Sequence, residues 1–217
     1  MINNSRLERK WVFNNTDKIT LLSSLINSNL YFKEQFKERS VNSIYYDNLS
    51  LTSAADNFAG NADREKFRVR WYGEDIDLLK NPILERKIKK NFYGYKKYYP
   101  LKKLNKKKIN EKNLSILTKN INLLIQHKNL YPVTVTSYKR IYLISSNAQI
   151  RATLDFDIKY KKLMNYIEDF FLNVNDTILE IKYPHNLDTY VRNELSGITR
   201  VSKNSKYINS LLNSNFY

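Results

Sequence analysis

The chain of 217 residues has no cysteine, two histidines, four glycines and four prolines. Without cysteine, disulfides and thiolate metal sites are excluded. No apolar run approaches the ~18 residues needed to span a bilayer, and the N-terminus lacks the apolar core of a signal peptide. We therefore expect a soluble, cytoplasmic protein, which a separate membrane protein partner could hold at the inner face of a membrane.

Several catalytic signatures are also missing. The sequence has no Gly-rich phosphate loop, no His-Glu-x-x-His motif and no Ser/His/Asp or Cys/His set. His127 and His185 stand alone, and surface or capping roles suit them better than catalysis. Phosphoryl transfer, however, can proceed without a protein nucleophile, because positioning and charge stabilisation do most of the work. The missing motifs therefore do not exclude a phosphoryl-transfer enzyme.

Positive charge is abundant: 37 lysines and arginines stand against 21 acidic residues, a formal net charge of +16. This balance points to nucleic acid, an anionic membrane surface or a polyanionic small substrate as partner. Asn, Ile and Tyr are also abundant throughout the chain, so part of the lysine excess reflects a general compositional bias and not a binding function. The arginines are a better guide, because the guanidinium fork suits bidentate phosphate recognition.

The stretch Arg64–Lys89 carries the clearest pattern. Side chains alternate between the two faces of a strand. One face of the first segment is therefore cationic and ends in a tyrosine: Lys66, Arg68, Arg70 and Tyr72. The other face is apolar: Phe67, Val69 and Trp71. After a short acidic loop, a second segment again places charges on one face: Glu85, Lys87 and Lys89. We predict a hairpin whose charged face binds an anion.

The same alternation recurs along the chain. It predicts further strands over residues 7–13, 41–46, 91–103, 133–142, 149–158 and 177–183, the last placing Glu180 and Lys182 on one face. The alternation of 149–158 is regular throughout. Residues 57–63, which contain Gly60, and the lysine-rich 102–108 are predicted to be polar loops.

Apolar residues spaced by three and four predict the helices. One begins after Thr16 or Asp17, with Ile19, Leu22, Leu25 and Ile26 on its apolar face. A second runs over 111–128, with Leu114, Leu117, Ile121, Leu124 and Ile125 on its apolar stripe. Short helices are expected at 185–195 and 206–212, the latter capped by Ser205. We predict an α+β fold in one domain over residues 1–217, an antiparallel β barrel with flanking helices.

The charged strand faces allow two interpretations. They could point to water, as in an ordinary one-sided sheet packed on helices. They could instead turn toward each other as the sheet curls, because the helices already cover the apolar faces. Two unit charges ~4 Å apart interact by about 4 kcal/mol at an effective dielectric of ~20, so converging cations need a counterion. That favours a tunnel for a nucleoside triphosphate or phosphate chain, with a divalent cation on one or two glutamates.

Six short motifs, in this order, resemble a known family: Arg68-Val-Arg-Trp-Tyr-Gly73, Leu84-Glu-Arg-Lys87, Tyr138-Lys-Arg140, Arg151-Ala-Thr-Leu-Asp155, Leu179-Glu-Ile-Lys182 and Ser205-Lys-Tyr207. The sequence is similar, from about Leu7 to Leu212, to the VTC domain, the catalytic domain of vacuolar transporter chaperone polyphosphate polymerases in the triphosphate tunnel metalloenzyme superfamily. The resemblance implies a tunnel barrel that uses Mn²⁺ or Mg²⁺ to transfer the γ-phosphoryl group of ATP to a growing polyphosphate chain.

The resemblance also implies residue roles. The catalytic cations would be Arg68, Arg70, Lys87, Arg140, Arg151 and Lys206. Further substrate contacts would be Lys10, Lys96 (beside Lys97), Tyr138, Lys182 and Ser205. Glu180 would be the metal ligand, a role that Asp155 or Glu85 could share or replace. As an alternative, Arg68 and Arg70 could be sheet-surface cations, Glu180 an ion-pair partner of a lysine, and Ser205 a plain helix cap.

Differences between this sequence and other superfamily members disfavour some of the superfamily's activities. Glu8-x-Lys10 resembles half of the Glu-x-Glu-x-Lys signature, with Arg6 in place of the first carboxylate, which disfavours a thiamine triphosphatase or class IV adenylyl cyclase. The chain resembles a free-standing microbial form, without the SPX sensor domain. The alternatives are a tunnel triphosphatase and a non-catalytic polyanion-binding module. Nucleic acid is not the expected partner, although Tyr93–Tyr99 interleaves aromatic and basic residues as single-strand binders do.

Overall fold

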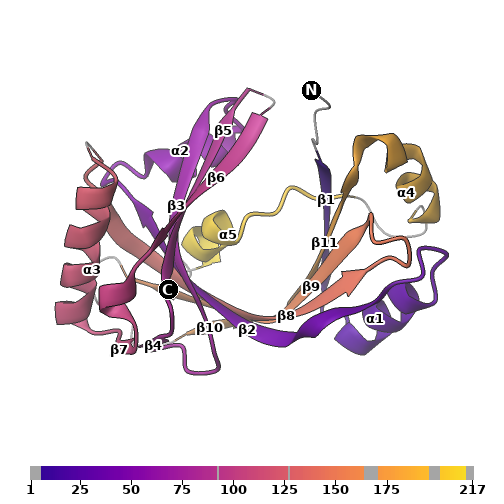
Figure 1. The fold of residues 1–217 in the computed structure, drawn as a ribbon, viewed down its shortest axis with the longest axis horizontal. Coiled ribbons are helices and arrows are strands. Elements are labelled where there is room, and N and C mark those ends of the chain that lie inside the picture. The colour runs from indigo at the N-terminus through magenta and orange to yellow at the C-terminus, as the bar shows by residue number, and fades with distance from the viewer. Residues whose placement is uncertain (1–5, 92, 127, 164–170, 196–200, 214–217) are drawn as a thin grey trace. The chain divides into compact units, whose positions relative to one another are not determined.

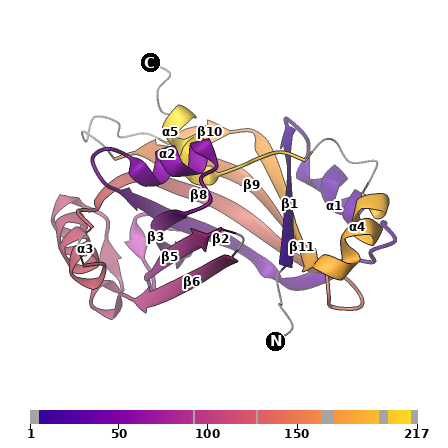
Figure 2. The same ribbon diagram turned by 90° about the horizontal axis from the view of Figure 1, so that it is seen from above.

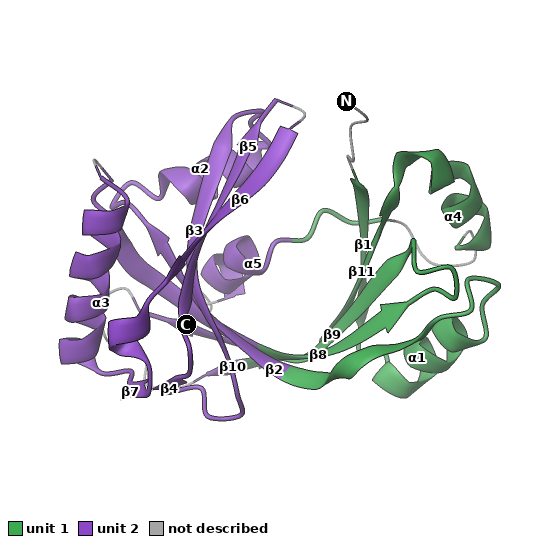
Figure 3. Ribbon diagram, in the orientation of Figure 1, with its two compact units in different colours: residues 1–39, 138–158, 173–204 green, residues 40–137, 159–172, 205–217 purple. Residues whose placement is uncertain are grey.

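The computed structural model describes residues 6–91, 93–126, 128–163, 171–195 and 201–213 (Figure 1). Internal contacts divide the chain into two compact units (Figure 3). Unit 1 comprises residues 1–39, 138–158 and 173–204, and unit 2 comprises residues 40–137, 159–172 and 205–217. Each unit is thus assembled from three separate stretches of chain.

Within the described residues, nine strands form one hydrogen-bonded sheet, and β4 and β7 pair separately. The strands are β1 (Arg6–Asn14), β2 (Lys33–Asp47), β3 (Arg64–Tyr72), β4 (Leu78–Leu79), β5 (Ile83–Lys90), β6 (Tyr93–Pro100), β7 (Lys107–Lys108), β8 (Tyr131–Ile144), β9 (Arg151–Lys162), β10 (Leu172–Val174) and β11 (Asp176–Pro184). The order in the sheet is β1-β11-β9-β8-β2-β3-β5-β6, with β10 beside β9. The prediction of an α+β fold with an antiparallel sheet is confirmed.

The core of unit 1 lies on the apolar faces of β1, β9 and β11. Trp11, Leu154 and Leu179 belong to this core. It is covered by α1 (Lys18–Ile26) and α4 (Asp188–Glu194), which contribute Leu25 and Val191. Arg9, which interrupts the apolar face of β1, pairs with Asp188 at 2.9 Å. The opposite, charged face of β1, β9 and β11 lies outside this core.

The core of unit 2 lies on the apolar face of the β3–β5 hairpin. Phe67, Val69 and Trp71 are buried there with Leu84 and the apolar stripe of α3 (Glu111–Leu124). The structure confirms the predicted split of this hairpin into an apolar and a charged face. Each buried side chain on such a face contributes about 1.5–3 kcal/mol through removal of apolar surface from water. Packing against α3 thus determines which face of the hairpin carries the charges.

Two shorter helices of unit 2, α2 (Thr52–Ala59) and α5 (Lys206–Leu212), lie near each other (Figure 2). The start of α2 is capped by Asp47 at the end of β2, which accepts the backbone N–H groups of Ser53 and Ala54 at 3.0 and 2.9 Å. The hydroxyl of Tyr207 on α5 donates to the same carboxylate at 2.7 Å. Asp47 therefore fastens both helices to the sheet.

Several helix predictions need correction. In α1, Ile19 and Ile26 are 63% and 48% exposed, because the nine-residue helix buries only a narrow stripe. The second helix ends at Leu124 and not at residue 128; Leu124 itself is 45% exposed. The predicted loop 57–63 begins inside α2, which Gly60 ends in the left-handed conformation (φ 77°) that glycine adopts without a steric penalty.

One loop prediction also changes, and one strand prediction is confirmed. The lysine-rich segment 102–108 contains a turn of 3₁₀ helix, Lys102–Leu104, and the short strand β7. The predicted apolar face of 149–158 is confirmed, since Ile150, Ala152, Leu154, Phe156 and Ile158 are all buried, although the backbone at Asp157 has a φ of 50°. His185 lies in a second 3₁₀ turn, His185–Leu187, and His127 lies outside the described residues. Within the described residues, no helix is both long and apolar enough to cross a membrane.

Candidate functional site

The charged face of unit 2 is a lattice of cations on three neighbouring strands. Lys66 on β3 lies opposite Lys87 on β5, which lies opposite Lys96 on β6. In the next row Arg68 lies opposite Glu85, and Arg70 is two residues further along β3, on the same face as Arg68. In these rows five cations thus share the face with one carboxylate, and the next pair along the strands, Arg64 opposite Lys89, adds two more cations at the strand ends. Like charges directly opposite each other destabilise a sheet, so this face is suited to a polyanion.

Glu85 neutralises part of this charge. Its carboxylate accepts Arg68 Nε at 2.7 Å and lies 3.5 Å from the Arg70 guanidinium. Burial acts to raise the pKa of Glu85, but the charges of Arg68 and Arg70 outweigh it, so its pKa falls below the ordinary value. Glu85 therefore stays ionised and orients the two arginines.

The register settles the position of Lys96. Lys87 lies opposite Lys96, whereas Lys97 lies opposite Arg86 on the other face of the hairpin. The charge of Lys96 also lowers the pKa of Glu85. Lys96, and not Lys97, therefore belongs to the charged face.

The last two predicted residues of unit 2, Ser205 and Lys206, stand at the start of α5. Ser205 is the N-cap residue of α5, as predicted, but its side chain makes no capping hydrogen bond. The hydroxyl instead accepts Lys66 Nζ at 3.0 Å. The structure thus brings the start of α5 to the charged face of β3.

The charged face of unit 1 is nearly neutral. Lys10 Nζ lies 2.9 Å from Glu8 and 3.2 Å from Glu180, and Lys182 contacts the same two carboxylates. These four residues alternate in sign across β1 and β11, with Glu8 opposite Lys182 and Lys10 opposite Glu180. The predicted residues Lys10, Glu180 and Lys182 are therefore in mutual contact.

The electrostatics of this cluster keep Glu180 ionised. Burial acts to raise its pKa, but the charges of Lys10, Lys182 and Arg140 together hold it well below the ordinary value. The pKa of Lys10 is raised: burial would lower it, and the Glu180 and Glu8 charges outweigh that effect. The cluster is thus a half-buried, balanced network in which the removal of one charge leaves its partners with an unbalanced charge.

Arg140, Tyr138 and Arg151 complete the predicted set. The Arg140 guanidinium grips both oxygens of Asp155, at 2.5 and 2.7 Å, and lies 5.2 Å from the ring centre of the buried Tyr138. Asp155 is therefore already occupied as an acceptor. Arg151 lies opposite Lys182 at the exposed end of β9, at the margin of the cluster.

Sequence reasoning left Lys66 and Ser43 out of the site. Lys66 shares the alternation of Arg68 and Arg70, so strand periodicity alone could have included it. Ser43 on β2 lies opposite Arg70, and within the described residues its buried Oγ has no hydrogen-bond partner. Only the register between β2 and β3 reveals that position, and no local sequence signal marks it.

The donor set of unit 1 fits a divalent cation. Within the described residues no group of three or more acidic or histidine side chains gathers around one point. Mg²⁺, however, is often held by only one or two carboxylates, with waters and substrate phosphates filling its other positions. Glu8 and Glu180 supply two carboxylates bound to the same lysines. Thr153, opposite Glu180, has a buried hydroxyl with no partner among the described side chains.

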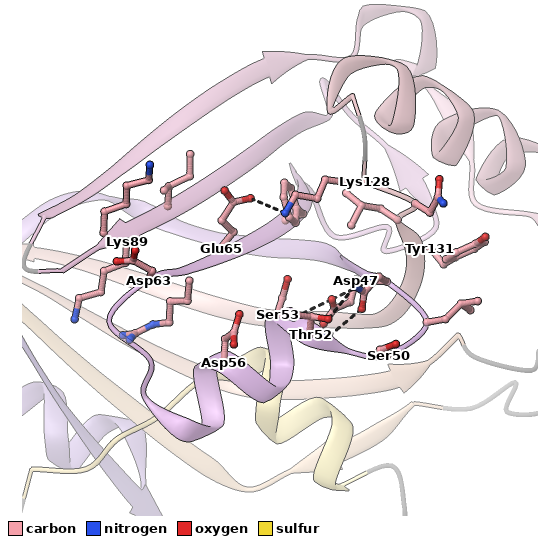
Figure 4. A pocket seen from close by; sticks show the side chains of 18 residues that line it. Asp47, Ser50, Thr52, Ser53, Asp56, Asp63, Glu65, Lys89, Lys128 and Tyr131 are labelled. Atoms are coloured by element: carbon pink, nitrogen blue, oxygen red, sulfur yellow. Dashed lines mark hydrogen bonds and ion pairs between the residues drawn. The ribbon is translucent and has the colours of Figure 1, made fainter.

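A separate pocket of about 560 Å³ lies beside α2 in unit 2 (Figure 4). Its charged lining residues are balanced: Asp47, Asp56, Asp63, Glu65, Arg64, Lys89, Lys90 and Lys128. None of the predicted site residues lines it. The Asp47 carboxylate already accepts several hydrogen bonds, so it is committed to the fold rather than to a ligand.

Solved structures share this fold. The chain aligns with a candidate adenylate cyclase from Bacillus halodurans at a TM-score of 0.55 and 14% identity, covering 98% of this chain and 97% of that one. A second candidate adenylate cyclase, from Vibrio parahaemolyticus, aligns at 0.51 and 13% identity, covering 94% and 97%. The PH1819 protein from Pyrococcus horikoshii OT3 aligns at 0.51 and 12%, covering 97% and 100%. At these identities the likeness establishes the fold class, an antiparallel tunnel fold with flanking helices.

The VTC domain matches residues 5–215, and the chain belongs to that family. No curated protein matches the sequence. Family and fold together support a triphosphate tunnel enzyme.

Proposed function

We propose that this protein is a metal-dependent polyphosphate polymerase that transfers the γ-phosphoryl group of ATP to a growing polyphosphate chain. The observation that carries the proposal is the charged face of unit 2, where five cations share three strands with a single carboxylate. A bound polyanion would offset the repulsion among these cations. VTC family membership favours ATP and polyphosphate over other polyanions.

In the proposed reaction, the bond between the γ-phosphorus and the bridging oxygen breaks, and its electron pair leaves with ADP. An oxygen of the terminal phosphate of the acceptor chain forms the new bond to phosphorus. Arg68 and Arg70, oriented by Glu85, stabilise negative charge on the transferred group. Lys87 and Lys96 hold neighbouring phosphates, and the buried hydroxyl of Ser43 is placed to donate a hydrogen bond beside Arg70.

In unit 1, Glu8 and Glu180 would hold the metal, Mn²⁺ or Mg²⁺. When bound, the ion would offset phosphate charge. Lys10 and Lys182 keep the two carboxylates ionised and oriented. Arg140, fixed by Asp155, and Arg151 at the margin add positive charge for phosphate oxygens.

The test is to incubate the purified protein with ATP and Mn²⁺, and separately with Mg²⁺, and to resolve polyphosphate, ADP and orthophosphate. We expect polyphosphate ladders and ADP in matching amounts. ADP with orthophosphate but no chains would indicate the alternative, a triphosphatase that uses water as acceptor. Tight tripolyphosphate binding without turnover would indicate a binding module.

A nucleic-acid binder is distinguished by competition. If the charged face takes short polyphosphates, a large excess of duplex DNA should fail to displace labelled tripolyphosphate at physiological salt. Efficient displacement, with DNA affinity falling steeply as salt rises, would contradict the proposed substrate class.

A further inference from the structure

The starting point is a difference between two helix N-termini of unit 2. At α3 the side chain of Asn110 accepts the backbone N–H of Asn113 at 2.9 Å, as an N-cap residue does. Ser205 occupies the same position at α5 but makes no such bond. Its hydroxyl is turned to β3, where it accepts Lys66 Nζ across 139 residues of sequence.

This contact determines that the Ser205 hydroxyl acts as an acceptor toward Lys66. A serine hydroxyl has one hydrogen to donate and two lone pairs. The Lys66 ammonium can only donate, so the Ser205 hydroxyl must accept and its own hydrogen points elsewhere. Lys66 shares the charged face with Arg68 and lies opposite Lys87. A phosphate oxygen on this face is a suitable acceptor for that hydrogen.

The anchoring of α5 does not depend on Lys66. The Tyr207 ring stacks on Tyr45 with 5.0 Å between ring centres, and its hydroxyl donates to Asp47. The hydroxyls of Ser210 and Thr134 lie 2.8 Å apart. Loss of the Lys66 ammonium would therefore leave the helix in place and release the Ser205 side chain.

We infer that Lys66 is a positioning residue that orients the Ser205 hydroxyl toward a phosphate oxygen on the charged face of unit 2. The inference rests on the proposed function only in taking a polyphosphate-like anion as the ligand. Lys66 would then have two roles: its charge attracts the anion directly, and its ammonium group orients the Ser205 hydroxyl.

A double-mutant cycle separates these two roles, with tripolyphosphate as the probe and affinity measured by calorimetry. Hydrogen bonds to charged groups justify an expected loss of about 30-fold for Lys66→Met and about 10-fold for Ser205→Ala. If Lys66 acts through Ser205, the double variant should lose no more than about 30-fold. Losses that multiply to about 300-fold would overturn the inference.

Three further variants exclude a structural or purely electrostatic explanation. Lys66→Arg keeps a donor for Ser205 and should bind within about threefold of the parent. Ser205→Thr keeps the hydroxyl and should behave likewise. Lys97→Met removes the same charge from the opposite face of the hairpin and should leave affinity unchanged. Equal losses in Lys97→Met and Lys66→Met would overturn the inference, as would a fall in melting temperature that accounts for the lost binding.

Turnover is measured in parallel. Coupled binding losses without polyphosphate synthesis by the parent would contradict the proposed function and leave the inference standing. Synthesis with multiplicative losses would contradict the inference alone. A parent protein that does not bind tripolyphosphate would contradict both.

Discussion

The two charged faces of this protein are built alike and charged differently. Each lies on neighbouring antiparallel strands whose other side is buried against helices. In unit 2, five cations meet one carboxylate. In unit 1 there are four cations, Lys10, Arg140, Arg151 and Lys182, and three carboxylates, Glu8, Asp155 and Glu180, most of them in ion pairs.

This difference suits the two faces to different tasks. A face on which cations outnumber carboxylates gains most from a polyanion, because ligand binding offsets repulsion between its own side chains. A balanced face is stable as it stands and presents ionised carboxylates, which suit a metal. We therefore propose that unit 2 mainly binds phosphate and that unit 1 binds the metal.

The largest expected effect is on unit 2. Arg70→Ala should lower ATP turnover by about 100-fold or more, since loss of one preorganised donor to developing charge costs that much. Turnover is measured by ADP release, with Arg192→Ala on the exposed side of α4 as the matched control. Full turnover in Arg70→Ala would contradict both the comparison and the proposed function.

The second prediction concerns unit 1. Glu180→Gln should reduce metal-dependent turnover by about 10–100-fold, because it removes a metal ligand. It should weaken metal-free tripolyphosphate binding far less than Arg70→Ala does. Glu34→Gln, an exposed carboxylate, is the control. If Glu180→Gln instead binds tripolyphosphate as poorly as Arg70→Ala, the division of tasks is wrong.

Ligand protection provides a third, smaller effect. At 100 times its dissociation constant, tripolyphosphate should stabilise the fold by about 2.7 kcal/mol and raise the melting temperature by about 5–10 °C. Hydrogen exchange should show the greatest slowing in β3, β5 and β6. Slowing confined to β1 and β11 would reverse the assignment of the two faces.

The smallest effect is on stability in acid, measured without metal. The folded-state pKa values of Glu180 and Glu85 lie below the ordinary 4.5, so the unfolded chain binds more protons just below that pH. Stability should therefore be lost as pH falls below about 4.5 toward the folded-state values. Thermal melts from pH 7 to 3 should show less of this loss in Glu180→Gln than in the parent, and a smaller difference for Glu85→Gln. Parallel curves for the parent and Glu180→Gln would refute this.

Strand faces were predictable from sequence because their period is local. Alternation alone placed Phe67 and Trp71 in the core and Arg68 and Arg70 on the charged face. It also grouped Glu180 with Lys182. Family resemblance supplied the site residues, and their catalytic roles remain predictions.

Features that depend on distant partners were not predictable. The pairing of Glu8 with Lys182 follows from the register of β1 and β11, which lie at opposite ends of the chain. The polar composition of α2 gave no helix signal, since part of its stability comes from Asp47. Ser205 had the residue type of a cap, and only the neighbouring Lys66 shows why the side chain is used differently.

The assembly of each unit from three stretches of chain has a consequence for engineering. Four of the described strands, β2, β8, β9 and β10, pass from one unit into the other. A cut of the chain at residue 39 or 40 would sever β2 within its hydrogen-bonded length and separate β1 from its partner β11. The two faces therefore cannot be produced as independent fragments, and variation that tunes one has to be tested in the intact chain.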